Sequence, residues 1–186
     1  MHVPYALSVC AAATPPVLGP MVVFMSETGL RPGEVAALES RDVDREAGVV
    51  LVRRVYAGGR VKEPKTERSR RRVPLTTRAG IALDSLPRRI DTRLLFPGAL
   101  GGPLDFHNFA RRDWHPALEA AGVPRRRVYD LRHTFASEAL AAGVSLYELS
   151  RFMGASVRVL EMHYAHLVDS AEDAARVKLD ARAAAV

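Results

Sequence analysis

Residues 129–167 read YDLRHTFASEALAAGVSLYELSRFMGASVRVLEMHYAHL, and this stretch constrains the fold and the chemistry more than any other. Arg132 opens an amphipathic helical pattern, and Tyr164 follows 32 residues later between His163 and His166. An arginine guanidinium binds phosphate oxygens with a planar fork, and a tyrosine hydroxyl can form covalent intermediates. The two residues are therefore a candidate pair for covalent chemistry on a phosphate.

Three helices are predicted within this stretch, at Asp130–Ala142, Ser145–Met153 and Val157–His163. Residues 143–163 also scan as a helix-turn-helix with its turn at Gly154. Such a unit can read DNA without any chemistry. Spacing alone therefore leaves a DNA-binding module open as the alternative.

The whole chain predicts a mixed α+β fold, mainly α-helical, with a small antiparallel sheet of about three strands. The strand signals VVLVRRVY, RVKEP and RRRVPL lie within Asp42–Leu75, with a turn at Gly58-Gly59. Caps and periodicity predict further helices at Val17–Thr28, Pro32–Leu38, Thr77–Leu86 and Asp105–Ala121. A chain of 186 residues favours one domain over 1–186, with an irregular lead-in at 1–16 and a tail helix at 169–186.

The charge balance points to an acidic partner. Net charge is +6 and the pI is about 10.0, so nucleic acid is the first candidate. The 27 basic residues comprise 24 Arg and three Lys, which suits phosphate binding but also fits a bias in genome base composition. Cys10 is the only cysteine, so no intramolecular disulfide can form, which fits a reducing compartment.

Two basic segments have both a chemical and a neutral interpretation. Arg31 lies at a loop-to-helix junction, where backbone N–H groups stabilise an anion, although an arginine there is more often a surface residue beside a helix cap. The hairpin Arg60–Arg72 holds seven basic and two acidic residues, which is typical of a solvated face but also of a β-ribbon on DNA. Lys65, near its tip, could donate a proton if neighbouring cations lower its pKa.

The histidines His133, His163 and His166 favour hydrogen-bonding roles over a metal site, because no third ligand is evident near the last two.

Taken together, four fragments resemble the tyrosine recombinase (phage integrase) family over about Val17 to His166. TGLRPGEVAAL is similar to the first-arginine motif of the family, PKTERSRRRVPL to its lysine hairpin and DLRHTFAS to its second-arginine motif. Tyr164 in HYAHL falls where the family has its nucleophile. The order and spacing of the four fragments carry the resemblance.

The resemblance implies a site-specific DNA recombinase that cuts and rejoins strands through a 3′-phosphotyrosyl intermediate. Tyr164 attacks the scissile phosphate, Arg31 and Arg132 hold its non-bridging oxygens, and Lys65 protonates the leaving 5′ oxygen. Neither metal nor ATP nor another cofactor is implied. The DNA-binding candidates are basic residues of the hairpin and of the segment before Arg132: Arg60, Lys62, Arg68, Arg70, Arg71, Arg72, Arg125, Arg126 and Arg127.

Two positions depart from the family pattern. Tyr129 stands where a histidine is usual, three residues before the second arginine, and Ala155 stands where His or Trp is usual. The Tyr129 hydroxyl could still donate a hydrogen bond to a phosphate. His133, His163 and Ser156 are the possible stand-ins for the missing donor. These departures support the second hypothesis, a catalytically silent DNA-binding module or regulator.

The resemblance also predicts partners and location. Family members carry a helical core-binding domain ahead of the catalytic one, and residues 1–16 are too short for it, so we expect it to be absent. Double-stranded DNA is then expected to bind weakly and with strong salt sensitivity. Self-association into a tetramer on DNA and a cytoplasmic, nucleoid-associated location in a prokaryote, phage or mobile element are expected.

Overall fold

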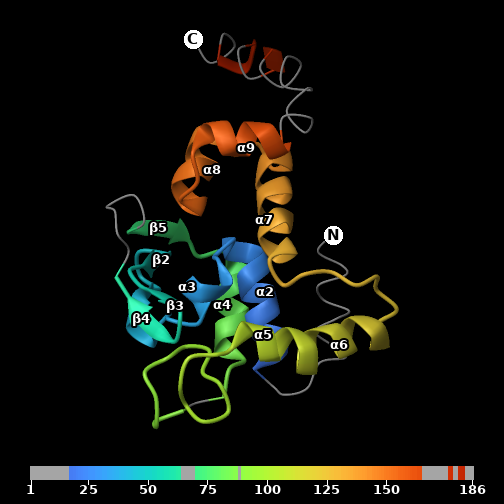
Figure 1. The fold of residues 1–186 in the computed structure, drawn as a ribbon. Helices are drawn as coiled ribbons and strands as arrows, with labels where there is room; N and C mark the ends of the chain where they lie inside the picture. The colour runs from blue at the N-terminus through green and yellow to red at the C-terminus, as the bar shows by residue number, and fades with distance from the viewer. Residues whose placement is uncertain (1–16, 64–69, 88, 165–175, 178–179, 183–186) are drawn as a thin grey trace.

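The computed structural model describes residues 17–63, 70–87, 89–164, 176–177 and 180–182. The predicted lead-in and most of the predicted tail helix lie outside the described residues. Within the described ranges no helix is long and apolar enough to cross a membrane. The fold is mainly helical with a small antiparallel sheet, as predicted (Figure 1).

The helices fall close to their predicted positions. They are α2 (Leu18–Thr28), α3 (Pro32–Val35), α4 (Thr77–Asp84), α5 (Phe106–Phe109), α6 (His115–Ala120), α7 (Asp130–Ala141), α8 (Leu146–Met153) and α9 (Val157–Tyr164). Short turns complete them: a 3₁₀ turn at Ser40–Asp42, and a π-helical turn at Ala110–Trp114 that joins α5 to α6. The helix predicted at Asp105–Ala121 is therefore irregular in its middle, because Pro116 lacks the N–H that would continue an α-helix.

The sheet is built differently from the simplest interpretation of its strand signals. The antiparallel order β1-β2-β5 joins Val43–Asp44, Val49–Val52 and Arg71–Pro74, with Val50 opposite Val73. The run VVLVRRVY splits at Arg53-Arg54, so its second half, β3 (Val55–Ala57), pairs with β4 (Arg60–Lys62) in a separate hairpin. Gly58 and Gly59 make the hairpin turn with φ of 60° and 76°, conformations that favour glycine.

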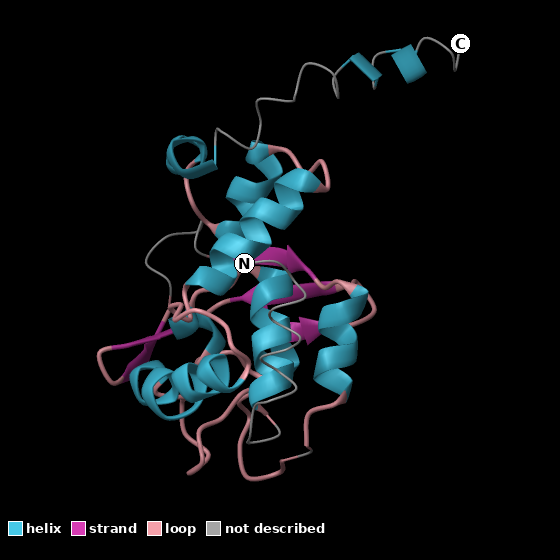
Figure 2. Ribbon diagram, turned by 90° about the vertical axis from the view of Figure 1, so that its right-hand side faces the viewer, coloured by secondary structure: helices cyan, strands magenta, loops and turns pink. Residues whose placement is uncertain are grey.

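One large apolar core joins the sheet to the helices. Helix α2 packs against both α4 and α7, and its side chains Met21, Phe24 and Met25 are almost fully buried. Trp114 is also buried, and its indole N–H donates to the carbonyl oxygen of Arg126 at 2.8 Å. Figure 2, which views the molecule from its helical side, shows the strands behind the helices. The core therefore fixes the segment that leads into α7.

A second, smaller core holds α8 and α9 against the distal half of α7. Its buried members are Ala136, Leu149, Met153, Leu160 and Tyr164. Helix α7 belongs to both cores, since Leu131 at its start packs in the large one and Ala136 in the small one. The two ends of α7 are thus held by different cores, so this helix fixes the position of the small core relative to the large one (Figure 1).

The junction between α2 and α7 depends on Gly29, which caps α2 at φ 61° and donates its N–H to Met25. A Cβ on Gly29 would lie 2.3 Å from Cδ1 of Phe135 on α7. We expect Gly29→Ala to be destabilising by several kcal/mol, because about 1–2 kcal/mol of left-handed strain and about 1–3 kcal/mol of overpacking add. Urea unfolding followed by circular dichroism measures the loss.

Gly48→Ala is the matched control for this change. Gly48 has the same left-handed φ, 62°, but a Cβ there would meet nothing within 4 Å. It should therefore lose only the backbone contribution. Equal losses in the two variants would show that the contact between Gly29 and Phe135 does not determine how α2 and α7 pack.

Candidate active site

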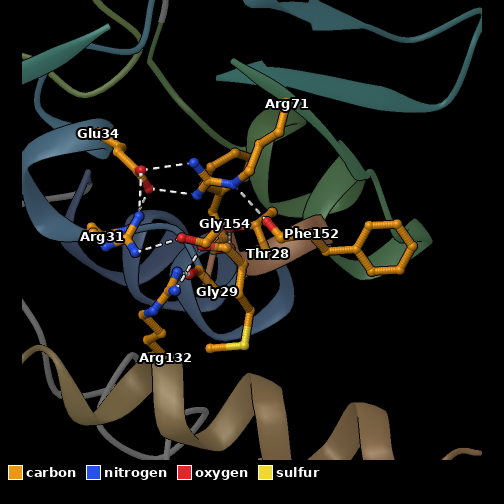
Figure 3. A network of polar contacts seen from close by, with 10 residues as sticks. Thr28, Gly29, Arg31, Glu34, Arg71, Arg132, Phe152 and Gly154 are labelled. Atoms are coloured by element: carbon orange, nitrogen blue, oxygen red, sulfur yellow. Dashed lines mark hydrogen bonds and ion pairs between the residues drawn. The ribbon is translucent and has the colours of Figure 1, made fainter. Parts of the chain in front are cut away.

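The end of α8 is the point where the predicted arginines meet. Three consecutive carbonyl oxygens there each accept a hydrogen bond from a different arginine (Figure 3). The pairs are Arg71 Nε to Phe152 at 2.6 Å, Arg132 Nη2 to Met153 at 2.7 Å, and Arg31 Nη2 to Gly154 at 3.0 Å. Carbonyls in the last turn of a helix lack intrahelical partners and carry partial negative charge, so they attract cations.

Arg31 is positioned by the start of α3. It is the extended residue before Pro32, and its own N–H donates to Oε2 of Glu34 at 2.8 Å, while Nη1 donates to Oε1 at 3.1 Å. Its side chain is 39% exposed, so the guanidinium is anchored on one side and open to solvent on the other. A guanidinium has more N–H donors than these contacts use, which leaves capacity for an anion.

Glu34 is a buried carboxylate shared by two arginines. Arg71 binds it with a fork, Nη1 to Oε1 at 2.8 Å and Nη2 to Oε2 at 2.7 Å. Burial raises the pKa of the Glu34 carboxyl, but the hydrogen bonds and charge of Arg71, helped by Arg31, outweigh burial and hold the pKa below its usual range. Glu34 is therefore ionised at neutral pH and locks Arg31 to Arg71.

Arg71 differs from the other basic residues assigned to DNA. Its side chain is 5% exposed and points into the protein, where Glu34 and Phe152 use its guanidinium. The physical reason is strand alternation: Arg71 lies on the same face of β5 as the buried Val73, whereas Arg72 faces solvent. The prediction that Arg71 contributes to a DNA-binding surface is wrong for this geometry, and the residue braces the site from inside.

Arg132 lies deepest among the site arginines, with an exposed fraction of 3%. Besides Met153, its guanidinium reaches the carbonyl oxygen of Gly29 at 2.5 Å. Burial, followed by the charge of Arg31, lowers the pKa of Arg132 to about 10, so it still carries its charge at neutral pH. With Arg31, Arg71 and one carboxylate, the cluster holds three positive charges and one negative, a net of two positive charges, which suits an anion.

Tyr164, at the end of α9, reaches the same region from the small core. The residue is 5% exposed, and its hydroxyl lies 2.6 Å from Nδ1 of His133, the residue after Arg132 on α7. Burial raises the pKa of the Tyr164 phenol, and the opposing charge of Arg132 does not cancel the rise. The hydrogen bond to His133 thus holds the Tyr164 hydroxyl against the part of α7 that carries Arg132.

The candidate stand-ins are placed unequally. The rings of Tyr129 and His163 both lie against His133, with centroids 5.6 Å and 6.2 Å away. Ser156 instead caps α9, its hydroxyl oxygen accepting from the N–H of Val159 at 3.3 Å. Ala155 packs against the small core.

The remaining predicted residues divide into two groups. Lys65 and Arg68 lie outside the described residues. The others are exposed on the hairpin, on β5 and on the segment before α7: Arg60, Lys62, Arg70, Arg72, Arg125, Arg126 and Arg127. Arg70 pairs with Glu63 and Arg127 with Asp130. In the part of the chain that is described, no group of three His, Cys, Asp or Glu could hold a metal ion.

Two parts of the site escaped the sequence analysis. Glu34 could have been found from its spacing, because an acid three residues after a helix-start residue suggests a capping box. The carbonyl oxygens of residues 152–154 have no side-chain signal, since every residue carries one.

Removal of Arg71 tests the bracing role. We expect Arg71→Ala to lose about 3–5 kcal/mol of unfolding free energy, because the buried carboxylate of Glu34 keeps only its partly exposed partner. Arg72→Ala, one residue along the same strand but exposed, should change stability by no more than about 0.5 kcal/mol. Urea unfolding of both variants supplies the comparison.

The stability of the wild type and of Arg71→Ala should change with pH in opposite directions. In the wild type the pKa of Glu34 is lowered on folding, so its contribution is present at neutral pH and is lost as pH falls through the folded pKa. Without Arg71, burial should raise that pKa instead, and stability should then increase as pH falls from about 7 to about 5. A parallel pH dependence in wild type and Arg71→Ala would contradict the assignment.

Comparison with known proteins agrees with this architecture. The sequence pattern that defines the phage integrase family matches residues 9–171. The "Putative prophage phiRv2 integrase" of Mycobacterium tuberculosis is 30% identical over 169 residues, which cover 86% of this chain and 45% of the relative. The chain thus spans less than half the length of that relative.

Solved structures show the same fold. XerA recombinase matches with a TM-score of 0.71 and 24% identity, over 96% of this chain and 62% of that one. The Tn1549 transposon integrase in complex with circular intermediate DNA matches with a TM-score of 0.70 and 23% identity, over 87% of this chain and 58% of that one. Because the family pattern covers most of the sequence, the chain belongs to the phage integrase family of tyrosine recombinases.

Proposed function

We propose that this chain is the catalytic domain of a site-specific DNA recombinase that breaks and rejoins strands through a phosphotyrosine. The observation that carries the proposal is that Arg31 and Arg132 both bind the last turn of α8. The Tyr164 hydroxyl forms a hydrogen bond with His133, the residue next to Arg132. Family membership and the likeness to an integrase solved with DNA support it.

In the proposed first step, Tyr164 Oη forms a bond to the scissile phosphorus while the bond from phosphorus to the 5′ oxygen breaks. Arg31 and Arg132 stabilise the charge on the non-bridging oxygens, and the two net positive charges of the cluster favour that build-up. Lys65 gives a proton to the leaving 5′ oxygen, and Tyr129 donates a hydrogen bond to the phosphate. A 5′-hydroxyl from a second strand reverses the step, so the bond energy is conserved.

A second candidate is a silent DNA-binding module of the same fold. Ala155 favours it, because this position packs against the small core and has no side-chain donor. The guanidiniums of Arg31 and Arg132 are also engaged by backbone carbonyls. A module of this kind would bind a cognate site and leave its strands intact.

Covalent trapping separates the two candidates. On a nicked suicide duplex the active chain should form a protein–DNA adduct that survives a denaturing gel, and Tyr164→Phe should form none, because the nucleophilic oxygen is gone. Tyr147→Phe, an exposed tyrosine on α8, is the matched control and should retain the adduct. Binding without any adduct in the wild type would favour the silent module.

Arg31→Lys tests electrostatic stabilisation without removing charge. We expect single-turnover cleavage to fall about 10²–10³-fold, because a lysine cannot reproduce the fork that holds Glu34, Gly154 and a phosphate together. Its circular dichroism spectrum should remain that of the wild type, since the side chain is partly exposed. Wild-type cleavage by this variant would remove Arg31 from the proposed chemistry.

The exposed arginines before α7 are proposed to contact the DNA backbone. Arg125→Ala with Arg126→Ala should weaken binding of all duplexes alike and reduce the slope of log K against log salt by about one unit for each lost phosphate contact. A charge-matched control is Arg41→Ala with Arg45→Ala. These two exposed arginines flank β1, and each already pairs with an acidic residue. Equal slopes in the two double variants would exclude the assigned contacts.

We further propose that the chain self-associates on DNA, as the family resemblance implies, and that it acts in the cytoplasm of a prokaryote or in a mobile element. The prophage relative supports the second point.

A further inference from the structure

The hydrogen bond between Tyr164 and His133 has a chemical direction. The phenol Oη lies 2.6 Å from Nδ1, at the short end of the range for such bonds. A phenol has one proton to donate, and a neutral imidazole with its proton on Nε2 accepts at Nδ1. In that tautomer the contact is O–H···N, with the tyrosine proton already aimed at the histidine.

A base is needed because the phenol is harder to ionise than a free tyrosine. An ordinary phenol has a pKa of about 10, so at pH 7 roughly one in a thousand is ionised. Burial raises the pKa of Tyr164 further. Spontaneous ionisation therefore supplies little nucleophile at neutral pH.

The groups around the phenol leave few candidates for that base. Arg132 is a cation and has no acceptor. The Glu34 carboxylate is occupied by Arg71 and Arg31. Among the described residues, His133 is the one that hydrogen-bonds to the phenol oxygen and can take a proton.

His133 is in the right state to accept. Burial lowers the pKa of its imidazole, Asp130 opposes the fall, and the charges of Arg127, His163 and Arg132 add to it. The net pKa lies below its ordinary value, so the ring is neutral at pH 7. Tyr129 lies with its ring edge-on, 5.6 Å away, and helps to fix the ring plane.

We propose that His133 is the general base that removes the proton of Tyr164 during cleavage, a role that rests on the proposed function. As Oη bonds to phosphorus and the 5′ oxygen leaves with its electron pair, the phenol proton passes to Nδ1. The 5′ oxygen takes its proton from a separate acid, Lys65 in the proposed scheme. During rejoining the imidazolium returns the proton to the departing phenolate, and Asp130, one turn earlier on α7, stabilises the cation in between.

The proposed base, His133, lies four residues after Tyr129, the position where the family usually has a histidine. The position three residues before Arg132 holds Tyr129, whose hydroxyl is a poor acceptor at neutral pH. His133 follows Arg132 directly, so one turn of a helix that both cores hold presents the phosphate-binding group and the base together. The departure at Tyr129 therefore does not leave the nucleophile without a base.

The test compares His133→Asn with His133→Ala on two substrates, in single-turnover cleavage of a suicide duplex. Asn places a hydrogen-bonding atom near the position of Nδ1 but takes no proton at neutral pH, so it preserves positioning and removes basicity. We expect both variants to cleave about 10²–10⁴-fold more slowly than the wild type. Near wild-type cleavage by His133→Asn would overturn the role, since it would show that the histidine only positions the phenol.

The second substrate carries sulfur in place of the bridging 5′ oxygen. A thiolate leaves without protonation, so this substrate should restore cleavage to Lys65→Ala but not to His133→Asn or His133→Ala. Rescue of the His133 variants by sulfur would assign the residue to the acid instead and would overturn the proposal.

The wild-type chain gives an independent measurement that needs no variant. Its cleavage rate should rise with pH while the imidazole of His133 loses its proton, which lowering of the His133 pKa places below the ordinary histidine range, and should then become level. His133→Asn should lack that plateau and continue to rise as the phenolate fraction grows. A wild-type rate that keeps rising from about pH 7 to about pH 9, as expected for His133→Asn, would contradict the role.

Failure of this inference is distinguishable from failure of the proposed function. If the wild type forms an adduct and His133→Asn matches its rate, the general-base role alone is wrong. If the wild type forms no adduct on either substrate, the recombinase chemistry fails and the role of His133 fails with it.

Discussion

The C-terminal turn of α8 is the element on which the site depends. Its carbonyl oxygens at 152–154 are the last acceptors of a helix, and each is used by an arginine from a different part of the chain: the start of α3, strand β5 and helix α7. These segments are 40 to 61 residues apart in sequence, from Arg31 to Arg71 and from Arg71 to Arg132. One helix end thus gathers them without a dedicated side chain.

Three guanidiniums in close proximity repel one another, and two features of the fold offset that repulsion. The negative end of α8, equivalent to roughly half an elementary charge, faces them directly. Glu34 supplies a full negative charge where Arg71 is most buried. The compensation is incomplete, since two positive charges remain. An anion at this site would offset the remaining repulsion.

The sequence predicted the helices well because their signals are local. Asp105, Ser145 and Gly29 cap helices as their residue types indicate. Arg31, Arg132 and Tyr164 were identified by residue type and order, whereas their convergence depends on packing between α2, α7 and α8. The basic run 60–72 predicts one exposed surface, but alternation along β5 buries Arg71 and exposes Arg72.

Tyr164 has two roles that constrain each other. Its ring fills the small core beside Leu149, Met153 and Leu160, so packing against these side chains fixes its position. Its hydroxyl, in contrast, is held by His133 on α7. Because Leu131, the residue before Arg132 on α7, belongs to the large core, packing along this one helix sets how the phenol lies relative to Arg132. A substitution that loosens α9 would therefore displace the hydroxyl without touching a charged residue.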